Sequence, residues 1–387
     1  MAILIWGIRE GRKQEAPRRP PQAEHGAPVS APTTAEPERR EVDLGEFDRR
    51  LVRAVQQAGG DDVWVKGRAA GNWDASGTES EAARTGHAGR VTEAVATPGA
   101  YQAVLSAIAA EAQRQGLDVR SSDVVAKRAG PAEQLEVLRN RQAVRRWEVR
   151  QVPRLYRAAI VIDDLGGDLA AAERLLSLPY GLTFSVLPYL AHSTAVAEEA
   201  HRDGREVMLH LPMEAEPGSG MAPGRGAIKL GMTGPEVVGT IDGDLANVPY
   251  VRGANNHMGS RATADARLMA EVMRTLANRH LYFIDSRTTV ETVAYDAARQ
   301  EGVPTFFRSV FLDDQQETAY SLRQLEAFRR IVEQRGAALA IGHPHPTTIE
   351  ALERFLPELE RDDVELVPPS ELVRLPEVAR ILPPRVH

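Results

Sequence analysis

Two adjacent carboxylates, Asp163 and Asp164, directly follow a run of apolar residues at 158–162. Like charges side by side repel each other, and burial raises the pKa of a carboxyl group unless a cation offsets the charge. A divalent metal is the simplest such cation, because one carboxylate can bind it while the other remains free to move a proton. The pair therefore predicts a metal ligand beside a general base.

Further polar side chains follow the later apolar runs of the chain. Oxygen and imidazole ligands together suit zinc or the harder first-row ions, and a metal lowers the pKa of a bound water to about 7. The pattern predicts a hydrolytic site with a divalent metal, zinc being the first expectation. Four of the ten histidines belong to this set, which comprises His210, Glu214, Asn255, Asn256, His257, Asp285, Arg287, Arg308, Asp313, Asp314, His343 and His345.

Each of these signals also has a plainer explanation. An aspartate pair after a strand is often a solvated turn, and Asp168 indicates that the following helix needs a cap. A single histidine beside a strand end is usually hydrogen-bonded structure, and His201 and His280 are expected on helices without a chemical role. The coincidence of carboxylates, asparagines and histidines at several strand ends favours a site.

The elements that must position these groups are predicted from residue 154 onward, where short apolar runs alternate with amphipathic segments. This alternation predicts a parallel sheet covered by helices, and the number of units favours a barrel, whose functional groups gather at the carboxyl ends of the strands. Capping boxes predict helix starts at Thr233 with Glu236, Ser321 with Gln324 and Thr347 with Glu350. The predicted strands are residues 158–162, 182–187, 206–209, 250–254, 281–284, 305–311, 337–341 and 364–367.

The composition excludes several functional classes. Hydrophobic residues make up 43% and charged residues 26% of the 387, which is ordinary for a globular protein. A net charge of −7 provides no basic surface for nucleic acid, so no nucleic-acid partner is expected. The absence of cysteine excludes disulfides, thiolate metal ligands and a cysteine nucleophile. The oligomeric state is left open.

The chain is predicted to contain four parts. The apolar start "MAILIWGI" is either a frayed terminus or the remnant of a membrane anchor, and the proline-rich stretch behind it predicts a disordered tether. Helices are expected at 42–56 and 100–117, and the glycine-rich loop 214–233 is either a mobile lid or a long surface loop. The parts are an anchor remnant and tether at 1–45, a small α/β region at 46–150 with a flexible insert at 67–90, the barrel at 154–376, and a tail at 377–387.

Residues 158 to about 376 resemble the divergent polysaccharide deacetylase family, a remote branch of the NodB-homology carbohydrate esterases. The resemblance rests on the stretches "AIVIDDLGG", "LTFSVLPY", "EVMLHLPMEA", "NNHMGSRAT", "FIDSRTT" and "IGHPHPTTIEAL". It implies an α/β fold whose deformed (β/α) barrel has about seven strands, preceded by the small α/β region and the disordered N-terminal tether.

The resemblance also implies roles for site residues. Asp163 matches the general base and Asp164 a metal ligand. His210 matches the first of two metal-binding histidines, Glu214 stands in place of the second, and His257 is available as a further ligand. Where ordinary enzymes have an arginine-proline motif, this chain has "GANNHMGS".

His343 or His345 matches the histidine that acts as general acid. With these residues the chain is expected to hydrolyse an acetamide or ester on a polysaccharide of the cell envelope, in the periplasm and with an inner-membrane tether. A catalytically inactive domain that binds glycan or acts as a scaffold is the alternative, and a metal-dependent phosphoesterase is a weaker one. The residues expected to bind substrate are Asn255, Asn256, Asp285 and Arg308.

Overall fold

The computed structural model describes residues 43–66, 91–124, 130–218, 222–374 and 381. The predicted anchor and most of the tether therefore lie outside the described residues, as do the insert at 67–90 and, apart from Ile381, the tail at 377–387. Within the described ranges, no helix combines the length and the apolar character needed to cross a membrane.

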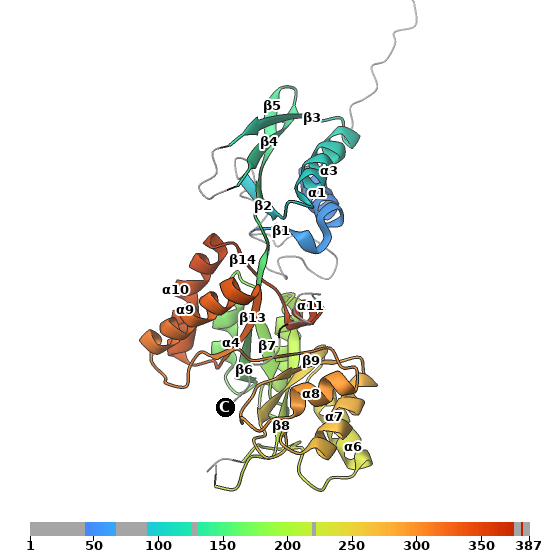
Figure 1. Cartoon of the computed structure of the whole chain (residues 1–387), viewed down its shortest axis with the longest axis vertical. Coiled ribbons are helices and arrows are strands. Elements are labelled where there is room, and N and C mark those ends of the chain that lie inside the picture. Colours follow the sequence, from blue (N-terminus) through green and yellow to red (C-terminus); the bar gives the residue numbers. More distant parts are fainter. Residues whose placement is uncertain (1–42, 67–90, 125–129, 219–221, 375–380, 382–387) are drawn as a thin grey trace, which may run out of the picture. The chain divides into compact units, whose positions relative to one another are not determined.

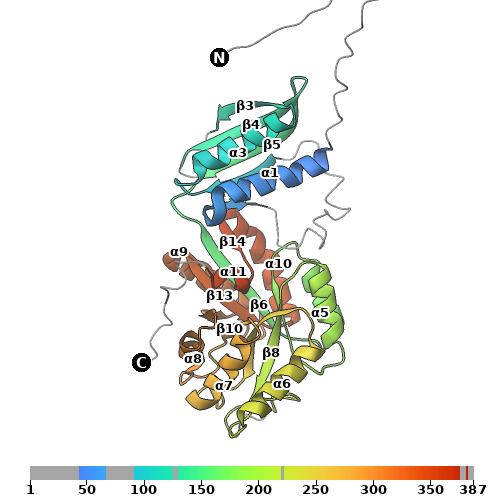
Figure 2. The ribbon, with the colours of Figure 1, turned by 90° about the vertical axis from the view of Figure 1, so that its right-hand side faces the viewer.

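The first described part is a small sheet with two helices. Helix α1 (Leu44–Gly59) is capped by the side chain of Asp43, buries Phe47 and Leu51, and lies beside α3 (Tyr101–Arg114) (Figure 2). A short 3₁₀ turn, η1 (Gly60–Asp62), follows α1. The sheet has the order β1-β2-β5-β4-β3, with β2 and β5 parallel and the other neighbours antiparallel. Its strands are β1 (Val63–Val65), β2 (Val91–Ala96), β3 (Asp118–Asp123), β4 (Ala132–Arg139) and β5 (Gln142–Gln151).

The second part is a curled parallel sheet (Figure 1). Its eight strands have the order β11-β10-β9-β8-β7-β6-β13-β12. A further strand, β14 (Val364–Leu366), pairs in parallel with the first half of β6. The predicted α/β fold with a deformed barrel is thus confirmed. The eight strands are β6 (Tyr156–Leu165), β7 (Thr183–Val186), β8 (Val207–Met213), β9 (Val251–Met258), β10 (Tyr282–Asp285), β11 (Thr305–Phe307), β12 (Val310–Phe311) and β13 (Ala337–Gly342).

One predicted strand, residues 305–311, is in fact two strands on opposite edges of the sheet. The backbone N–H of Arg308 donates to Asp285 beside β11, at 2.9 Å, and that of Ser309 donates to Leu339 of β13, at 2.7 Å. The chain therefore passes, at Arg308 and Ser309, from β11 at one edge of the sheet to β12 at the other edge. The prediction of a single strand was wrong because apolar content alone does not record this change of partner.

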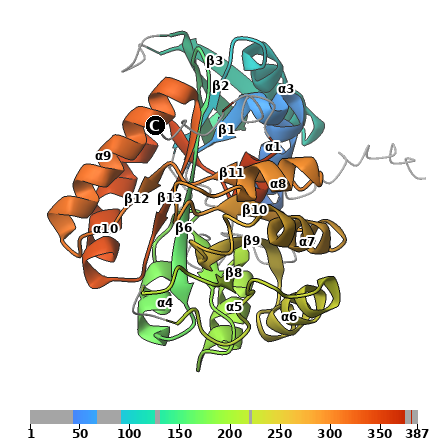
Figure 3. The same cartoon turned by 60° about the horizontal axis from the view of Figure 1, so that its bottom comes forward.

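Helices cover the outer side of the curled sheet (Figure 3). The capping box at Thr233 and Glu236 is confirmed. The other two were wrong: Ser321 already donates its N–H to Glu317 one turn inside a helix, and Pro346 occupies the first position of the helix that contains Thr347. The helices are α4 (Leu169–Leu176), α5 (Ser193–Arg202), α6 (Gly234–Asn247), α7 (Ala266–Ala277), α8 (Ala294–Gln300), α9 (Thr318–Arg335), α10 (Pro346–Arg361) and α11 (Pro369–Leu372).

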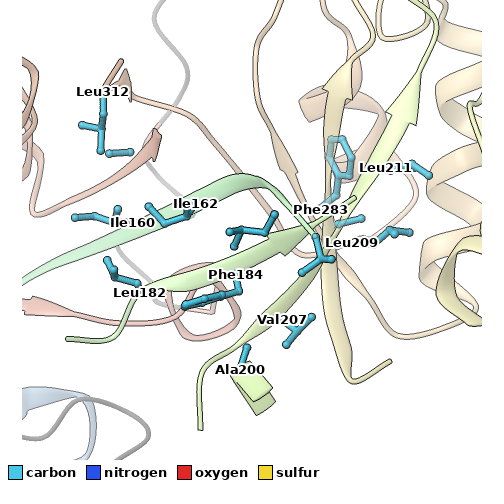
Figure 4. Close-up of a cluster of buried hydrophobic side chains, with 14 of the residues drawn as sticks. Ile160, Ile162, Leu182, Phe184, Ala200, Val207, Leu209, Leu211, Phe283 and Leu312 are labelled. Carbon is cyan, nitrogen blue, oxygen red and sulfur yellow. The ribbon is translucent and has the colours of Figure 1, made fainter. Parts of the chain in front are cut away.

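Alternation along the strands divides the core into two clusters. Ile160 and Ile162 of β6 belong to the cluster that includes helical residues, together with Phe184, Leu209 and Phe283 (Figure 4). The residues in between, such as Ala159, Val161 and Met208, belong to a second cluster on the opposite face of the sheet. Because side chains alternate with period two, positions 163, 210, 255, 257 and 343 continue the phase of this second face.

Candidate metal centre and active site

A β-bulge at the end of β6 explains how both aspartates of the pair reach one site. Adjacent residues of a regular strand point to opposite faces, but the register between β6 and β7 shifts between Ile162 and Leu165. Asp164 sits in this bulge with φ +57°, a left-handed conformation that aspartate tolerates better than most residues. As a result, Asp163 Oδ1 lies 3.7 Å from Nδ1 of His210, and Asp164 Oδ1 lies 3.1 Å from its Nε2.

Asp164, His210 and His257 form a compact set of potential metal ligands. Their ligand atoms all lie within 4.8 Å of one another. Nδ1 of His257 is 3.0 Å from Asp164 Oδ1 and 3.1 Å from Nε2 of His210. Asp164 Oδ1 is buried, and among the described residues it has no partner with hydrogen-bond geometry. Two imidazole nitrogens and an unsatisfied carboxylate oxygen converging on one point fit a divalent cation.

The electrostatics of this set also favour positive charge at its centre. Burial acts to raise the pKa of Asp164, but the attraction of His210 and His257 lowers it far below its usual range. Burial acts to lower the pKa of His210, yet the negative charges of Asp163 and Asp164 raise it above its ordinary value. An ionised Asp164 can serve as a metal ligand, and the negative surroundings that favour a proton on His210 would equally favour a metal cation in place of that proton.

Asn255 is the hub that orients the site. It is fully buried, and its amide nitrogen donates to both oxygens of Asp163, at 2.8 and 3.0 Å. Its oxygen must therefore face the other way, where it accepts from Ser185 at 2.7 Å and lies 3.0 Å from Nδ1 of His210. Nδ1 of His210 consequently carries the proton and leaves the lone pair of Nε2 for a metal. The sequence predicted Asn255 as a substrate contact, and in the structure both ends of its amide are bound within the protein.

His343 is held by the carboxylate of Asp313, a member of the predicted set to which the sequence assigned no role. Asp313 Oδ1 lies 2.9 Å from Nδ1 of His343, and Oδ2 accepts from the His343 backbone at 2.6 Å and from Thr348 at 2.7 Å. Burial acts to lower the pKa of His343, but the bond to Asp313 and its charge raise it to about 9. The free Nε2 of His343 is 3.9 Å from Asp164 Oδ2, so it faces the ligand set. Asp313 follows β12 after one intervening residue, Leu312, and stands beside a second carboxylate, as the members of the first aspartate pair do.

The other candidate acid, His345, lies beside His343 but, among the described residues, forms no ion pair or hydrogen bond with Asp164. It is the N-cap residue of α10, its Nε2 is 3.2 Å from Nε2 of Gln316, and its ring centroid is 5.9 Å from that of His343. Asp313, His343 and His345 form a second group with metal-ligand spacing. This group is the poorer metal site, because both oxygens of Asp313 already accept hydrogen bonds.

Glu214 is not part of the ligand set, contrary to the sequence prediction. The chain leaves β8 after Met213, and the Glu214 carboxylate is 2.6 Å from the Arg261 guanidinium and accepts from the Leu230 N–H at 2.7 Å. Glu214 therefore joins the loop after β8 to the loop after β9. His257, rather than Glu214, lies with Asp164 and His210 in the group that could hold a metal ion.

Three predicted substrate contacts are engaged within the protein. Asn256 points opposite to Asn255, where its amide binds Met258 and Ser286 of the backbone. Asp285 is buried and accepts from the Arg287 N–H and from Thr292. Arg308 donates to the carbonyl oxygens of residues 286 and 287, and its guanidinium stacks 3.9 Å above the ring of Phe311. These hydrogen bonds hold the backbone at the carboxyl ends of β9 and β10 in place.

Comparison with known proteins agrees with this fold. A model of the family described as divergent polysaccharide deacetylase matches residues 160–373, more than half of the chain. An uncharacterised protein of Haemophilus influenzae is 37% identical over 227 residues, which cover 59% of this chain and 79% of that protein. The uncharacterised protein YibQ of Escherichia coli is also 37% identical over 227 residues, covering 59% of this chain and 70% of YibQ. The crystal structure of the uncharacterised protein ATU2773 from Agrobacterium tumefaciens is 25% identical with a TM-score of 0.54, covering 57% of this chain and 89% of that one. The chain belongs to the divergent polysaccharide deacetylase family.

Proposed function

We propose that the chain is a metal-dependent hydrolase that removes acyl groups, in particular acetyl groups, from a polysaccharide of the cell envelope. The observation that carries the proposal is the position of Asp164, which lies between two histidines that could bind a metal and a third histidine that could donate a proton. Its Oδ1 meets His210 and His257, and its Oδ2 lies 3.9 Å from His343. A ligand set, a buried carboxylate and a protonated histidine thus surround one point, as acyl hydrolysis requires.

Asp164, His210 and His257 would hold the metal. Three protein ligands are the number that catalytic zinc sites use, and the mixture of imidazole and carboxylate donors suits zinc. When bound, a divalent cation supplies positive charge that polarises an acyl oxygen and acidifies a water molecule.

The remaining residues would move protons. Asp163, fixed by the amide of Asn255, accepts a proton from the attacking water, whose oxygen forms the new bond to the acyl carbon. His343 donates a proton from Nε2 to the leaving nitrogen or oxygen as the acyl bond breaks. Asp313 binds the opposite ring nitrogen and keeps His343 protonated at neutral pH. The base, Asp163, and the acid, His343, are therefore oriented by different residues, Asn255 and Asp313 respectively.

A non-catalytic glycan-binding or scaffolding role is the second candidate. It is favoured by Glu214, which stands where a second histidine ligand is expected and binds Arg261 instead of facing the ligand set. Under either candidate, we propose the cell envelope, and the periplasm within it, as the location of the chain.

Acetate release distinguishes the two candidates. The full chain, loaded with zinc, is incubated with N-acetylglucosamine oligomers and with an O-acetylated polysaccharide, and free acetate is measured. We expect Asp163→Asn to keep zinc and lose turnover, whereas His201→Ala, which alters an exposed helical histidine, keeps both. Full turnover in Asp163→Asn would refute the assigned base. Saturable oligomer binding by wild type without any acetate would support the second candidate.

A further inference from the structure

A basic groove lies between the two helices of the small region, apart from the candidate active site. Its volume is about 560 Å³, within the range of ligand-binding pockets. Four arginines line it, three from α1 and one from α3, together with two glutamates. These residues are Arg49, Arg50, Arg53, Arg114, Glu46 and Glu111.

The acidic residues of the groove do not neutralise all of the arginines. Glu46 pairs with Arg50, one turn along α1, and Glu111 pairs with Arg114 on α3. Among the described residues, the side chains of Arg49 and Arg53 form neither an ion pair nor a hydrogen bond, and the charge of Arg49 acts on Asp43 only at longer range, where it helps to lower the pKa of that carboxyl group.

The acid nearest to Arg49 in sequence is also engaged elsewhere. The carboxylate of Asp48 binds the guanidinium of Arg145 on β5, at 2.6 and 2.8 Å. The basic character of the groove is local, because the described residues of the small region up to 151 include eleven basic and twelve acidic side chains. The groove therefore concentrates positive charge on a nearly neutral domain.

The spacing of the two arginines indicates a ligand with more than one negative group. Residues four apart on a helix lie on one face, separated by about 6 Å along the axis. The planar guanidinium group binds carboxylate or phosphate through two parallel hydrogen bonds. A ligand whose anionic groups repeat along a chain can engage both arginines at once.

We propose that this groove binds an anionic polysaccharide through carboxylate or phosphate groups on its sugars. The inference goes beyond the proposed hydrolysis and rests on it for the ligand class, since the same chain would then bind and deacylate an envelope polymer. The described residues of the small region, 43–66, 91–124 and 130–151, would serve as a binding module that raises the local concentration of substrate.

Binding of defined polymers to the full chain tests the proposal. Polygalacturonate supplies carboxylates, a phosphorylated mannan supplies phosphates, and dextran is the neutral control. We expect wild type to bind at least one charged polymer, more weakly as salt rises, and not dextran. The double variant Arg49→Gln with Arg53→Gln should bind about tenfold more weakly. Arg330→Gln with Arg335→Gln, which removes the same charge from the exposed face of α9, should bind as wild type does.

Several results would contradict the proposal that this groove binds an anionic polysaccharide. Equal weakening by the two double variants would mean attraction to net charge alone. If the chain bound phosphatidylglycerol vesicles more tightly than either polymer, and if this binding depended on Arg49, the groove would be a membrane-binding site. Asp163→Asn separates this proposal from the catalytic one, because it should keep polymer affinity while losing acetate release. Arg49-dependent binding without acetate release by wild type would refute only the hydrolase, and acetate release without such binding would refute only the groove.

Discussion

Replacing Asn255 with leucine removes the amide that joins four buried polar side chains, at similar side-chain volume. The bonds lost are those to Asp163 at 2.8 and 3.0 Å, to Ser286 at 3.2 Å, from His210 at 3.0 Å and from Ser185 at 2.7 Å. A hydrogen bond to a charged group contributes about 1.5–3 kcal/mol and a neutral one about 1 kcal/mol. Allowing for the apolar surface gained, we expect the free energy of unfolding to fall by about 3 kcal/mol, measured by urea denaturation.

The same variant should weaken metal binding. Without the acceptor on Asn255, His210 loses the bond that fixes its tautomer, so zinc affinity should fall about 10- to 100-fold in calorimetric titration. Asn256→Leu is the matched control, because the neighbouring amide is equally buried but binds the backbone of residues 258 and 286. The control should lose comparable stability and keep its zinc affinity. Wild-type zinc affinity in Asn255→Leu, or equal loss in both variants, would refute the assignment of Asn255 as the residue that orients His210.

Three further substitutions test the acid and the ligand set. Asp313→Asn removes the charge that holds the pKa of His343 at about 9, so this pKa should fall toward 6.5 and the alkaline limb of kcat should move to lower pH; an unmoved limb would exclude His343 as the acid. Because the pKa of His343 is raised in the folded chain, the stability it contributes is complete below about 6.5 and is lost as pH rises through about 9. The loss of unfolding free energy in Asp313→Asn should therefore be larger at about pH 6 than at about pH 10. Glu214→Gln should weaken the bond to Arg261 and still bind zinc, whereas His257→Ala should no longer bind zinc. Loss of zinc binding in Glu214→Gln would show that Glu214 is a ligand after all.

Periodicity was sufficient to predict the fold and most of the inward-facing positions. Each predicted strand from 158 onward corresponds to an observed one, except that 305–311 is divided into β11 and β12. Alternation then places His210, Asn255, His257 and His343 on one face, because all four continue the phase of buried strand residues. Local patterns of this kind are visible in a sequence because they depend on neighbours only a few residues away.

Features that depend on distant partners could not be predicted. The bulge that turns Asp164 inward is set by the register with β7, and regular alternation would have pointed its side chain outward. Glu214 lies at the spacing of a ligand, but its carboxylate is bound by Arg261, 47 residues away. The pairing of Asp313 with His343 likewise spans 30 residues and two strands. Spacing alone cannot choose between such partners.

The metal content of the purified full chain tests the central claim most directly. After refilling with zinc and removal of excess metal, mass spectrometry should find about one equivalent per wild-type chain and almost none in Asp164→Asn or His257→Ala. Asparagine suits the left-handed backbone at position 164, so that variant should remain folded. A wild-type chain that binds no zinc, or variants that keep the full equivalent, would contradict a metal site formed by Asp164, His210 and His257.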